Sequence, residues 1–282
     1  VSNYKTEAMK ISQIQIKKMW GKQDIELNHV DPKVNILVGP TGSGKSTFLR
    51  FIYLLLTSDI KELNKLKTDI FIRFDAGGSI LYHADKKDFS IEFQKDWLSD
   101  IEYINTFDIP TAKKSAQSSL MQELDMTIYP LNKNVFNFID YRSKILNYPE
   151  QSEKIQERIL MLFKIINRFF ASTQKQISIN SKNKMVFTFL NQEEIEPEQL
   201  SSGEKQLLLI LLKVFLKEDK PFILLMDEPE LSLHIEWQRQ LIEAIQILNK
   251  NCQIILSTHS PSIFADGWGD KLVFMDDIVK PI

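Results

Sequence analysis

One segment of the chain has the residue types and spacing of a phosphate-binding loop. Residues 39–47 read Gly-Pro-Thr-Gly-Ser-Gly-Lys-Ser-Thr, which fits G-x-x-x-x-G-K-[ST] at every fixed position. Glycines let the backbone turn its N–H groups toward phosphate oxygens at a helix N-terminus, where the helix dipole also favours negative charge. Lys45 would reach the β and γ phosphates of a nucleotide, and the Ser46 hydroxyl would hold Mg²⁺. The predicted phosphate-binding residues are Gly39, Pro40, Thr41, Gly42, Ser43, Gly44, Lys45, Ser46 and Thr47.

A pair of carboxylates much further along the chain would complete this site. Asp227 and Glu228 follow the apolar run at residues 222–226 and precede Pro229. Asp227 would hold Mg²⁺ through water, and Glu228 would orient and deprotonate an attacking water. An acidic pair after a strand also simply opens a turn, so this interpretation depends on the loop at residues 39–47.

Buried strands and a helix must bring these groups together. Residues 34–38 and 222–226 are short continuous apolar runs, typical of strands buried on both faces. Residues 46–56 predict a helix whose apolar surface is wide enough to lie between two sheets. The C-terminal part alternates as βαβ units do. It predicts helices at 203–216 and 235–248, a short helix after Pro261, and strands at 253–256 and 271–274.

The remaining segments predict an antiparallel sub-domain and a small helical lobe. Residues 11–18 favour an edge strand, and residues 69–94 favour a three-stranded antiparallel meander. Residues 101–107 favour another strand, and residues 111–122 a connector with a short helix. The lobe is predicted to contain helices at 131–146 and 151–170, and a hairpin formed by 176–180 and 185–190 is predicted to follow it.

A third segment, residues 200–206, reads Leu-Ser-Ser-Gly-Glu-Lys-Gln and begins the helix before the Asp-Glu strand; we call it the signature segment. Ser201 and Glu204 have the spacing of a capping box, which by itself indicates only a well-started helix. An exposed helix N-terminus with Ser and Gly is also suited to gripping a γ-phosphate. Because Lys45 already holds that phosphate, the second grip would come from another subunit.

The three segments together resemble the ABC class of ATPases, whose signature is Leu-Ser-Gly-Gly-Gln. Leu200, Ser201 and Gly203 match it, while Ser202 and Glu204 replace Gly and Gln. In that family two subunits sandwich two ATPs, and each signature helix completes the other subunit's site. The resemblance therefore implies an ATP-dependent dimer with Ser201, Ser202 and Gly203 at the nucleotide.

Two histidines refine the resemblance. His259, in Ser-Thr-His-Ser after the strand at 253–256, looks like the switch histidine that senses the γ-phosphate, although a lone histidine there is often structural. Residues 231–234 read Leu-Ser-Leu-His, where transporter ATPases typically read Ser-Ala-Leu-Asp. This resembles the SMC/RecF/OLD-like branch, with RecF-like repair proteins, overcoming-lysogenization-defect (OLD) ATPases and the ATPases of Septu-type and retron-linked phage defence. His234 would lie at the dimer interface, or serve only to start a helix.

Two features of the family are not identifiable in the chain. A glutamine near Mg²⁺ normally follows the strand before the helical lobe, and here Asp108, Gln117 or Gln122 would have to replace it. Trp20 is a candidate for the aromatic residue that stacks on adenine, but a packing role suits it equally.

The composition excludes several classes of protein. The chain has 282 residues, 35 Lys and Arg against 37 Asp and Glu, and a net charge of −2. It is therefore not a disordered, collagen-like or rod-like chain, and its whole surface is not a polyanion-binding face. No apolar run approaches the roughly 18 residues of a membrane span, and residues 1–10 lack a signal-peptide pattern. With one cysteine, Cys252, we expect a cytoplasmic protein without a membrane partner.

The sequence thus predicts an α/β P-loop NTPase: an ABC-type ATPase head with an antiparallel β sub-domain and a small helical lobe. We expect a single domain over 1–282, with a P-loop lobe at 1–107, a helical lobe at 108–175, and a lobe with the signature, Asp-Glu strand and switch at 176–282. ATP and Mg²⁺ are the expected cofactors. Lys45, Glu228 and His259 would be catalytic, with Ser46 and Asp227 at the metal.

The resemblance implies a homodimer or higher homo-oligomer that hydrolyses ATP to ADP and phosphate. It would control DNA or a nuclease or toxin acting in trans, in anti-phage defence. A RecF-like repair ATPase, a transporter subunit and a nucleotide-gated scaffold with little turnover are the alternatives. DNA or RNA stays open as a partner, because Lys113 and Lys114 would reach phosphates, whereas mixed lysine and glutamate on helices is usually a solvated face.

Overall fold

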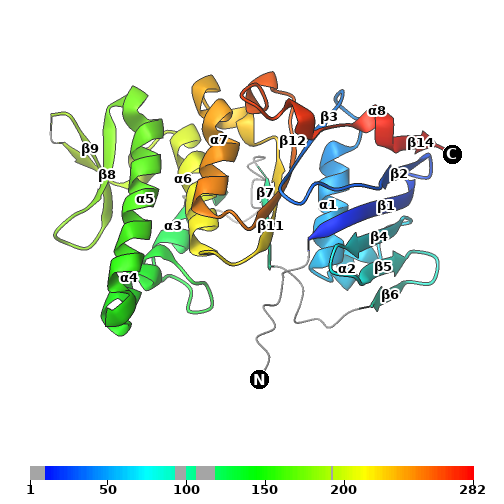
Figure 1. Cartoon of the computed structure of the whole chain (residues 1–282), viewed down its shortest axis with the longest axis horizontal. Coiled ribbons are helices and arrows are strands. Elements are labelled where there is room, and N and C mark those ends of the chain that lie inside the picture. The colour runs from blue at the N-terminus through cyan, green and yellow to red at the C-terminus, as the bar shows by residue number, and fades with distance from the viewer. Residues whose placement is uncertain (1–9, 93–99, 106–117, 192) are drawn as a thin grey trace. The chain divides into compact units, whose positions relative to one another are not determined.

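The computed structural model describes residues 10–92, 100–105, 118–191 and 193–282. The chain folds into two compact units, which are described separately. The first unit comprises Val1–Asn105, Lys220–Pro229 and Asn251–Ile282, and the second comprises Thr106–Asp219 and Glu230–Lys250. The chain passes between the units several times, so segments distant in sequence build each of them (Figure 1).

The first unit contains a five-stranded, entirely parallel sheet. In spatial order its strands are β13 (Leu272–Phe274), β3 (Val34–Val38), β12 (Cys252–Ser257), β11 (Phe222–Asp227) and β7 (Asp100–Asn105). Every residue of β11 and β12 is buried, which confirms the expectation drawn from their continuous apolar runs. Asp227 is in register with Ser257 on one side and with Asn105 on the other. The carboxyl ends of three strands therefore meet at one edge of the sheet.

A six-stranded antiparallel sheet forms the other layer of the first unit. Its spatial order is β14 (Val279–Pro281), β2 (Gln23–Leu27), β1 (Ile11–Met19), β4 (Asp69–Phe74), β5 (Ser79–His83) and β6 (Asp88–Ile91). The meander formed by β4, β5 and β6 was correctly predicted. The edge position predicted for residues 11–18 is wrong, because β2 and β4 pair with β1 on its two sides. Apolar residues alternate along β1 because one face of the strand packs against the core, not because the strand lies at the edge of the sheet.

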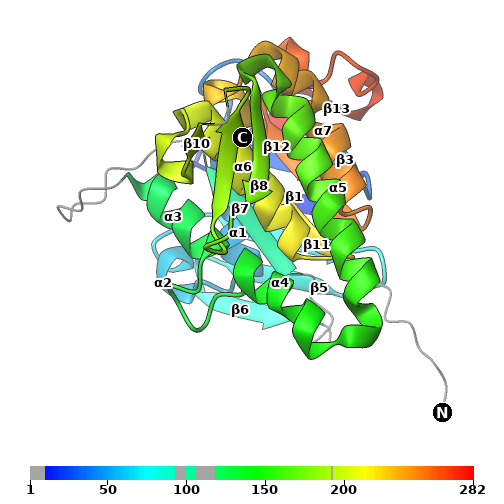
Figure 2. The ribbon, with the colours of Figure 1, turned by 90° about the vertical axis from the view of Figure 1, so that its left-hand side faces the viewer.

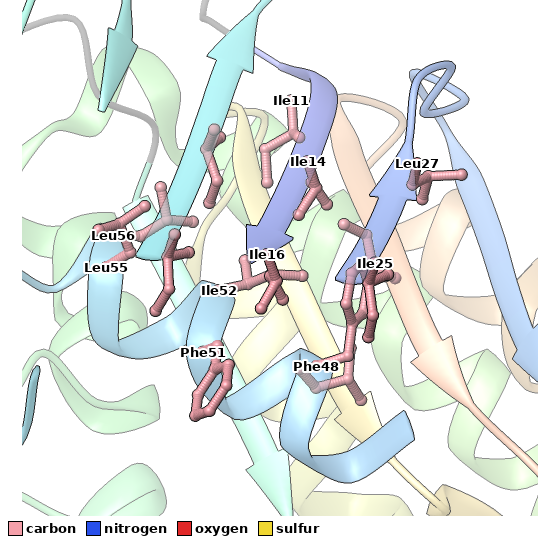
Figure 3. Close-up of a cluster of buried hydrophobic side chains, with 14 of the residues drawn as sticks. Ile11, Ile14, Ile16, Ile25, Leu27, Phe48, Phe51, Ile52, Leu55 and Leu56 are labelled. Carbon is pink, nitrogen blue, oxygen red and sulfur yellow. The ribbon is translucent and has the colours of Figure 1, made fainter. Parts of the chain in front are cut away.

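Helix α1 (Lys45–Leu56) packs in the core of this unit. Phe48, Ile52 and Leu55 of α1 are fully buried, together with Ile14 and Ile16 of β1. Figure 3 shows Phe48 and Ile52 of α1 beside Ile16 of β1 and Ile25 of β2. The helix is held by apolar contacts along its length, and this fixes where its N-terminus, and thus the loop before it, lies. Two one-turn helices, α2 (Ile60–Leu63) and α8 (Met275–Ile278), complete the unit.

The second unit consists of helices and a small sheet. Its helices are α3 (Ser119–Ile128), α4 (Phe138–Asn147), α5 (Ser152–Phe170), α6 (Ser202–Leu216) and α7 (Ile235–Leu248). An antiparallel sheet of β8 (Lys175–Ile179), β9 (Met185–Phe189) and β10 (Glu194–Ile195) lies with β8 beside α5 (Figure 2). The apolar residues of α5 at helical spacing are buried, as their spacing predicted.

The helix predicted at residues 131–146 was too long. Residues 131–137 form turns, and α4 begins only after Asn137, whose side chain accepts a hydrogen bond from the backbone N–H of Asp140 in a capping box. Because the Asn137 side chain caps the helix, the helix begins only after this residue, although the apolar residues before it also have helical spacing. Most of α3 was not predicted, since only its first residues fall in the segment 111–122.

Candidate functional site

The loop between β3 and α1 has the backbone of an anion site. Gly42 and Gly44 have φ angles of +83° and +98°, a region that side chains other than glycine rarely adopt. Gly44 is the residue before α1, and because it has no side chain it offers no cap to the first N–H groups of the helix. The first turn of α1 also carries no acidic residue. These N–H groups and the helix dipole are thus available to a phosphate.

A buried hydroxyl in the same loop supports this assignment. Ser43 Oγ is inaccessible to solvent and has no hydrogen-bond partner in the part of the chain that the structure describes. A Cβ at Gly39 would come within 3.1 Å of that oxygen and of Met275 Cβ. An unpaired buried hydroxyl is costly. Its presence in a cradle of glycines fits a ligand rich in oxygen acceptors, as a triphosphate is.

Lys45 extends from this loop to a histidine at the end of β12. Its side chain is buried, and Nζ donates hydrogen bonds to the carbonyl oxygens of Gly39 and Pro40 at 2.8 and 3.2 Å. The same Nζ lies 2.9 Å from His259 Nε2. That nitrogen is also 3.4 Å from Glu228 Oε1. The structure therefore brings together the three residues that the sequence predicted to be catalytic.

The two residues predicted at the metal are in direct contact. The Ser46 hydroxyl donates to Asp227 Oδ1 at 3.0 Å, and the Ser257 hydroxyl donates to the same oxygen at 2.5 Å. Asp227 is only 2% exposed. A carboxylate and a hydroxyl beside a phosphate loop are the oxygen donors that Mg²⁺ combines with phosphate oxygens. The donor set fits Mg²⁺, and Ser257 was not assigned a role from the sequence.

Glu228 is held in an uncommon backbone conformation. Its φ is +48°, and its backbone N–H donates to the carbonyl oxygen and to the hydroxyl of Ser257, both at 3.1 Å. A non-glycine residue with positive φ persists only where its surroundings impose it, and such residues gather at functional sites. Here the strain turns the carboxylate of Glu228 toward His259, one residue after the buried Asp227.

Strand β7 contributes polar groups that the sequence did not single out. Asn105 ends β7 in register with Asp227. Burial raises the pKa of Tyr103, and the negative charge of Asp227 raises it further, so its hydroxyl is neutral. Among the glutamine substitutes, Asp108 and Gln117 lie outside the described residues, and Gln122 belongs to α3 of the second unit. Asn105 was hard to detect because only strand register places it beside Asp227.

Trp20 lies next to the phosphate loop. Its ring is within 3.3 Å of where a Cβ at Gly44 would be, and its exposed fraction is 52%. It shares the lining of a pocket with Thr47 and Arg50 of α1. An exposed aromatic side chain at this position is suited to stacking on a ligand.

The signature segment lies in the second unit and forms the N-terminus of α6. Ser201 and Glu204 make the predicted capping box: the backbone N–H of Glu204 donates to Ser201 Oγ at 3.3 Å, and that of Ser201 donates to Glu204 Oε2 at 2.9 Å. Gly203 packs so closely that a Cβ would be 2.1 Å from the carbonyl oxygen of Ser232. Ser201 and Ser202 are exposed. Gly203 thus has a packing reason to be glycine in addition to any contact with a nucleotide.

His234 is also in the second unit, where it caps helix α7. Its Nδ1 accepts a hydrogen bond from the backbone N–H of Glu236 at 3.4 Å, and the ring is exposed. The helix-start role considered from the sequence is therefore present. Its neighbours Leu231 and Ile235 are also exposed, with 56% and 51% of their surface accessible.

Comparison with known families identifies the chain. Residues 34–265 match the family described as "AAA domain, putative AbiEii toxin, Type IV TA system". The chain belongs to this family. The match runs from β3, which leads into the phosphate loop, past His259, and so contains the predicted phosphate, metal, signature and switch residues. This places the protein among the AAA- and ABC-type ATPases, as the ABC resemblance predicted.

Individual relatives include proteins of defence systems. "Retron Vc95 probable ATPase" of Vibrio cholerae is 28% identical over 52% of this chain and 29% of its own length. The Septu protein PtuA of Bacillus thuringiensis is 22% identical over 89% of this chain and 72% of its own. "Phosphate import ATP-binding protein PstB 2" of Streptococcus pyogenes is 25% identical over 84% of the chain and 68% of its own. The chain spans less than a third of the retron relative.

The solved structures confirm the fold. A crystal structure of an SMC head bound to the C-terminal winged-helix domain of ScpA superposes with a TM-score of 0.62 and 14% identity, covering 96% of both chains. The predicted fold class, an α/β P-loop ATPase head with an antiparallel β sub-domain and a small helical lobe, is therefore correct. No helix in the described part of the chain is both long and apolar enough to cross a membrane.

Proposed function

We propose that the chain binds ATP with Mg²⁺, pairs with a second copy around the nucleotide, hydrolyses it, and thereby controls an effector protein in anti-phage defence. The observation that carries the catalytic part is the convergence of Lys45 and Glu228 on one nitrogen of His259, beside the contact of Ser46 with Asp227. This arrangement lies entirely within the first unit.

Nucleotide binding requires Lys45 to change partners. In the structure its ammonium group donates to the carbonyl oxygens of Gly39 and Pro40. Phosphate oxygens are stronger acceptors for an ammonium than neutral carbonyls, so a triphosphate in the loop would draw these hydrogen bonds to itself. The backbone N–H groups at the start of α1 and the hydroxyl of Ser43 would add donors. The loop therefore needs little rearrangement to bind ATP.

Ser46 and Asp227 would hold Mg²⁺ between the protein and the phosphates. When bound, the ion supplies positive charge that offsets the charge developing on the phosphate oxygens. Ser257 donates to Asp227 Oδ1 and so orients the carboxylate. Asp227 would act on the ion through water, as expected from the sequence.

Glu228 would activate the attacking water. Its carboxylate takes a proton as the water oxygen attacks the γ-phosphorus, and the bond to the β-phosphate oxygen breaks to release ADP. His259 lies between this carboxylate and Lys45, so it contacts the base and the phosphate-binding lysine at once. A group in that position registers whether the γ-phosphate is present.

A second copy of the chain would close the site. The signature segment of that copy would supply a second helix N-terminus to the bound phosphate. Ser201, Ser202 and Gly203 would face the γ-phosphate there, with His234, Leu231 and Ile235 along the same interface. The resemblance of the signature segment to the Leu-Ser-Gly-Gly-Gln signature of ABC ATPases supports this pairing.

The defence role is supported by the names of two relatives. PtuA belongs to a Septu system, and the other ATPase belongs to a retron. Control of a separate nuclease or toxin is the output we propose, with DNA or RNA as a further ligand. The similarity to PstB favours one alternative, the ATP-binding subunit of a transporter. The Leu-Ser-Leu-His segment at 231–234 argues against it.

Purification of the native, untagged complex from its source tests the proposal. Its mass and composition should be measured with ATP and Mg²⁺ and again after nucleotide removal. We expect a complex that changes mass with ATP and contains a nuclease, a toxin or nucleic acid. Recovery of a membrane permease would overturn the defence role in favour of transport. A bare homodimer would instead favour a repair ATPase or a scaffold.

A further inference from the structure

Glu204 of the signature segment is a buried anion at the place where a phosphate is proposed to bind. Its side chain is only 2% exposed, and it lies in the first turn of α6. Ser201 donates to Glu204 Oε2 twice, from its backbone N–H at 2.9 Å and from its hydroxyl at 3.0 Å. The carboxylate thus occupies donors that a phosphate would need.

Two residues outside the signature segment hold the other carboxylate oxygen. Lys175 Nζ donates to Glu204 Oε1 at 2.6 Å, and the Thr173 hydroxyl donates to it at 3.0 Å. Lys175 is 12% exposed and begins β8, while its ammonium lies 5.3 Å from the centre of the Phe189 ring on β9. Glu204 is therefore satisfied on both oxygens, and its charge is balanced by one lysine.

The electrostatic balance of this cluster depends on Lys175. Burial raises the pKa of Glu204, but the hydrogen bonds from Lys175, Ser201 and Thr173 together bring that pKa below its ordinary value. The group is therefore an anion at neutral pH. An anion beside a helix N-terminus weakens the attraction of that terminus for phosphate, unless a cation offsets it. The closest cation to Glu204 among the described contacts is Lys175.

We propose that Lys175 is a positioning residue of the signature segment, whose charge offsets Glu204 so that the N-terminus of α6 can accept the γ-phosphate bound by a second copy. This inference rests on the proposed ATP-dependent pairing. With Lys175 in place, the Ser201 hydroxyl exchanges its hydrogen bond from Glu204 to the phosphate without leaving an uncompensated buried charge. Because Lys175 is the first residue of β8, it also connects the signature segment to the sheet formed by β8 and β9.

The test measures the ATP concentration that gives half-maximal pairing, by light scattering in the Glu228→Gln background with Mg²⁺. Lys175→Met should raise this concentration by about tenfold or more, because a charge-assisted hydrogen bond to a buried anion is lost. Lys175→Arg keeps the charge and should stay near the parent. The double variant Lys175→Met/Glu204→Gln removes both charges and should return to within about threefold of the parent.

Two controls separate this role from a purely structural one. Lys144 forms a more exposed ion pair with Glu218 at 2.7 Å in the same unit, so Lys144→Met should lower the Tm slightly without changing the ATP dependence. ATP binding by the separated chains, measured by calorimetry, should be unchanged in Lys175→Met, because the phosphate loop belongs to the first unit. The Tm of each variant must lie above the assay temperature.

The outcomes are distinguishable. If Lys175→Met lowers the Tm but pairs at the parent's ATP concentration, or if the double variant pairs no better than Lys175→Met, the positioning role is wrong while the proposed function stands. If the parent with Glu228→Gln binds ATP and never pairs, both proposals are overturned. A shift in Lys175→Met that is rescued by Glu204→Gln supports the inference.

Discussion

The phosphate site of the first unit and the signature segment of the second are both helix N-termini, but their donors are in opposite states. At α1, Gly44 provides no cap and Ser43 Oγ has no partner among the described residues. At α6, Ser201 caps the helix, and Glu204 accepts the N–H and hydroxyl of Ser201. One terminus is open to a ligand, and the other is internally satisfied.

This difference indicates an order of events. A helix N-terminus with unused donors binds an anion readily, whereas one with a capping box must give up internal hydrogen bonds first. We therefore expect ATP to bind the first unit of a single chain, and the signature segment to engage only afterwards, in a second copy. Variants of the phosphate loop should therefore lose ATP binding, whereas variants of the signature segment should bind ATP but not pair.

Lys45→Ala should have the largest effect. It removes the ammonium group that contacts Gly39, Pro40 and His259, so ATP affinity should fall by about 100-fold or more. Calorimetric titration with Mg²⁺-ATP measures this directly. Lys61→Ala, which changes an exposed lysine of α2, is the matched control and should bind as the parent does. Equal affinities for Lys45→Ala and the parent would contradict the assignment of the loop.

Glu228→Gln should separate binding from hydrolysis. The amide keeps the shape of the side chain but accepts no proton from water, so turnover should fall by about 10²–10⁴-fold while ATP still binds. Phosphate release measures the rate. Glu157→Gln, on the exposed side of α5, should leave it unchanged. Turnover at the parent's rate in Glu228→Gln would show that another group is the base.

Gly203→Ala should disturb the signature segment alone. A Cβ would be 2.1 Å from the Ser232 carbonyl oxygen, so the backbone must shift, at a cost of about 1–3 kcal/mol in the free energy of unfolding. That cost exceeds the gain of up to about 1 kcal/mol from replacing glycine in a helix. Thermal unfolding measures the loss. In Gly269→Ala a Cβ meets nothing within 4 Å, so an equally destabilised Gly269→Ala would refute the steric explanation.

The smallest effect lies away from both regions, on the antiparallel sheet. Hydrogen bonds from Lys17 and Lys280 lower the pKa of Glu26 to about 2, from an ordinary value of 4.5. A depressed pKa contributes stability that is present above about pH 4.5 and is lost as the pH falls toward about 2. Glu26→Gln should flatten the dependence of Tm on pH in that window and leave ATP binding intact. An unchanged dependence of Tm on pH in Glu26→Gln would mean that the contacts of Glu26 with Lys17 and Lys280 contribute nothing to stability.

The phosphate site of the first unit was largely predictable from the sequence. The motif at residues 39–47 and the apolar runs before it and before Asp227 predicted strands, loop and helix almost to the residue. Short continuous apolar runs are typical of strands that are buried on both faces, and the glycine loop and the acidic pair that follow them favour this interpretation. Ser257 and Asn105 were not found, since their proximity to Asp227 arises from strand register, which no local pattern encodes.

The signature segment and the elements around it in the second unit were predictable only in part. The capping box of α6 and the spacing along α5 were visible in the sequence. The contacts of Glu204 with Thr173 and Lys175 join residues 31 and 29 positions apart, and neither has a motif. The start of α4 was misplaced because Asn137 had not been recognised as a cap. Tertiary contacts, not periodicity, decide these features.

The most direct test of the account is whether the signature segment is needed for pairing but not for binding. The mass of Glu228→Gln should be compared with that of Glu228→Gln/Ser201→Arg by light scattering with Mg²⁺-ATP, alongside the ATP bound per chain. We predict twice the 32.9 kDa of one chain for the first and a single chain for the second, with one ATP per chain in both. Equal masses for the two proteins, or loss of ATP binding in the Ser201→Arg protein, would contradict the account.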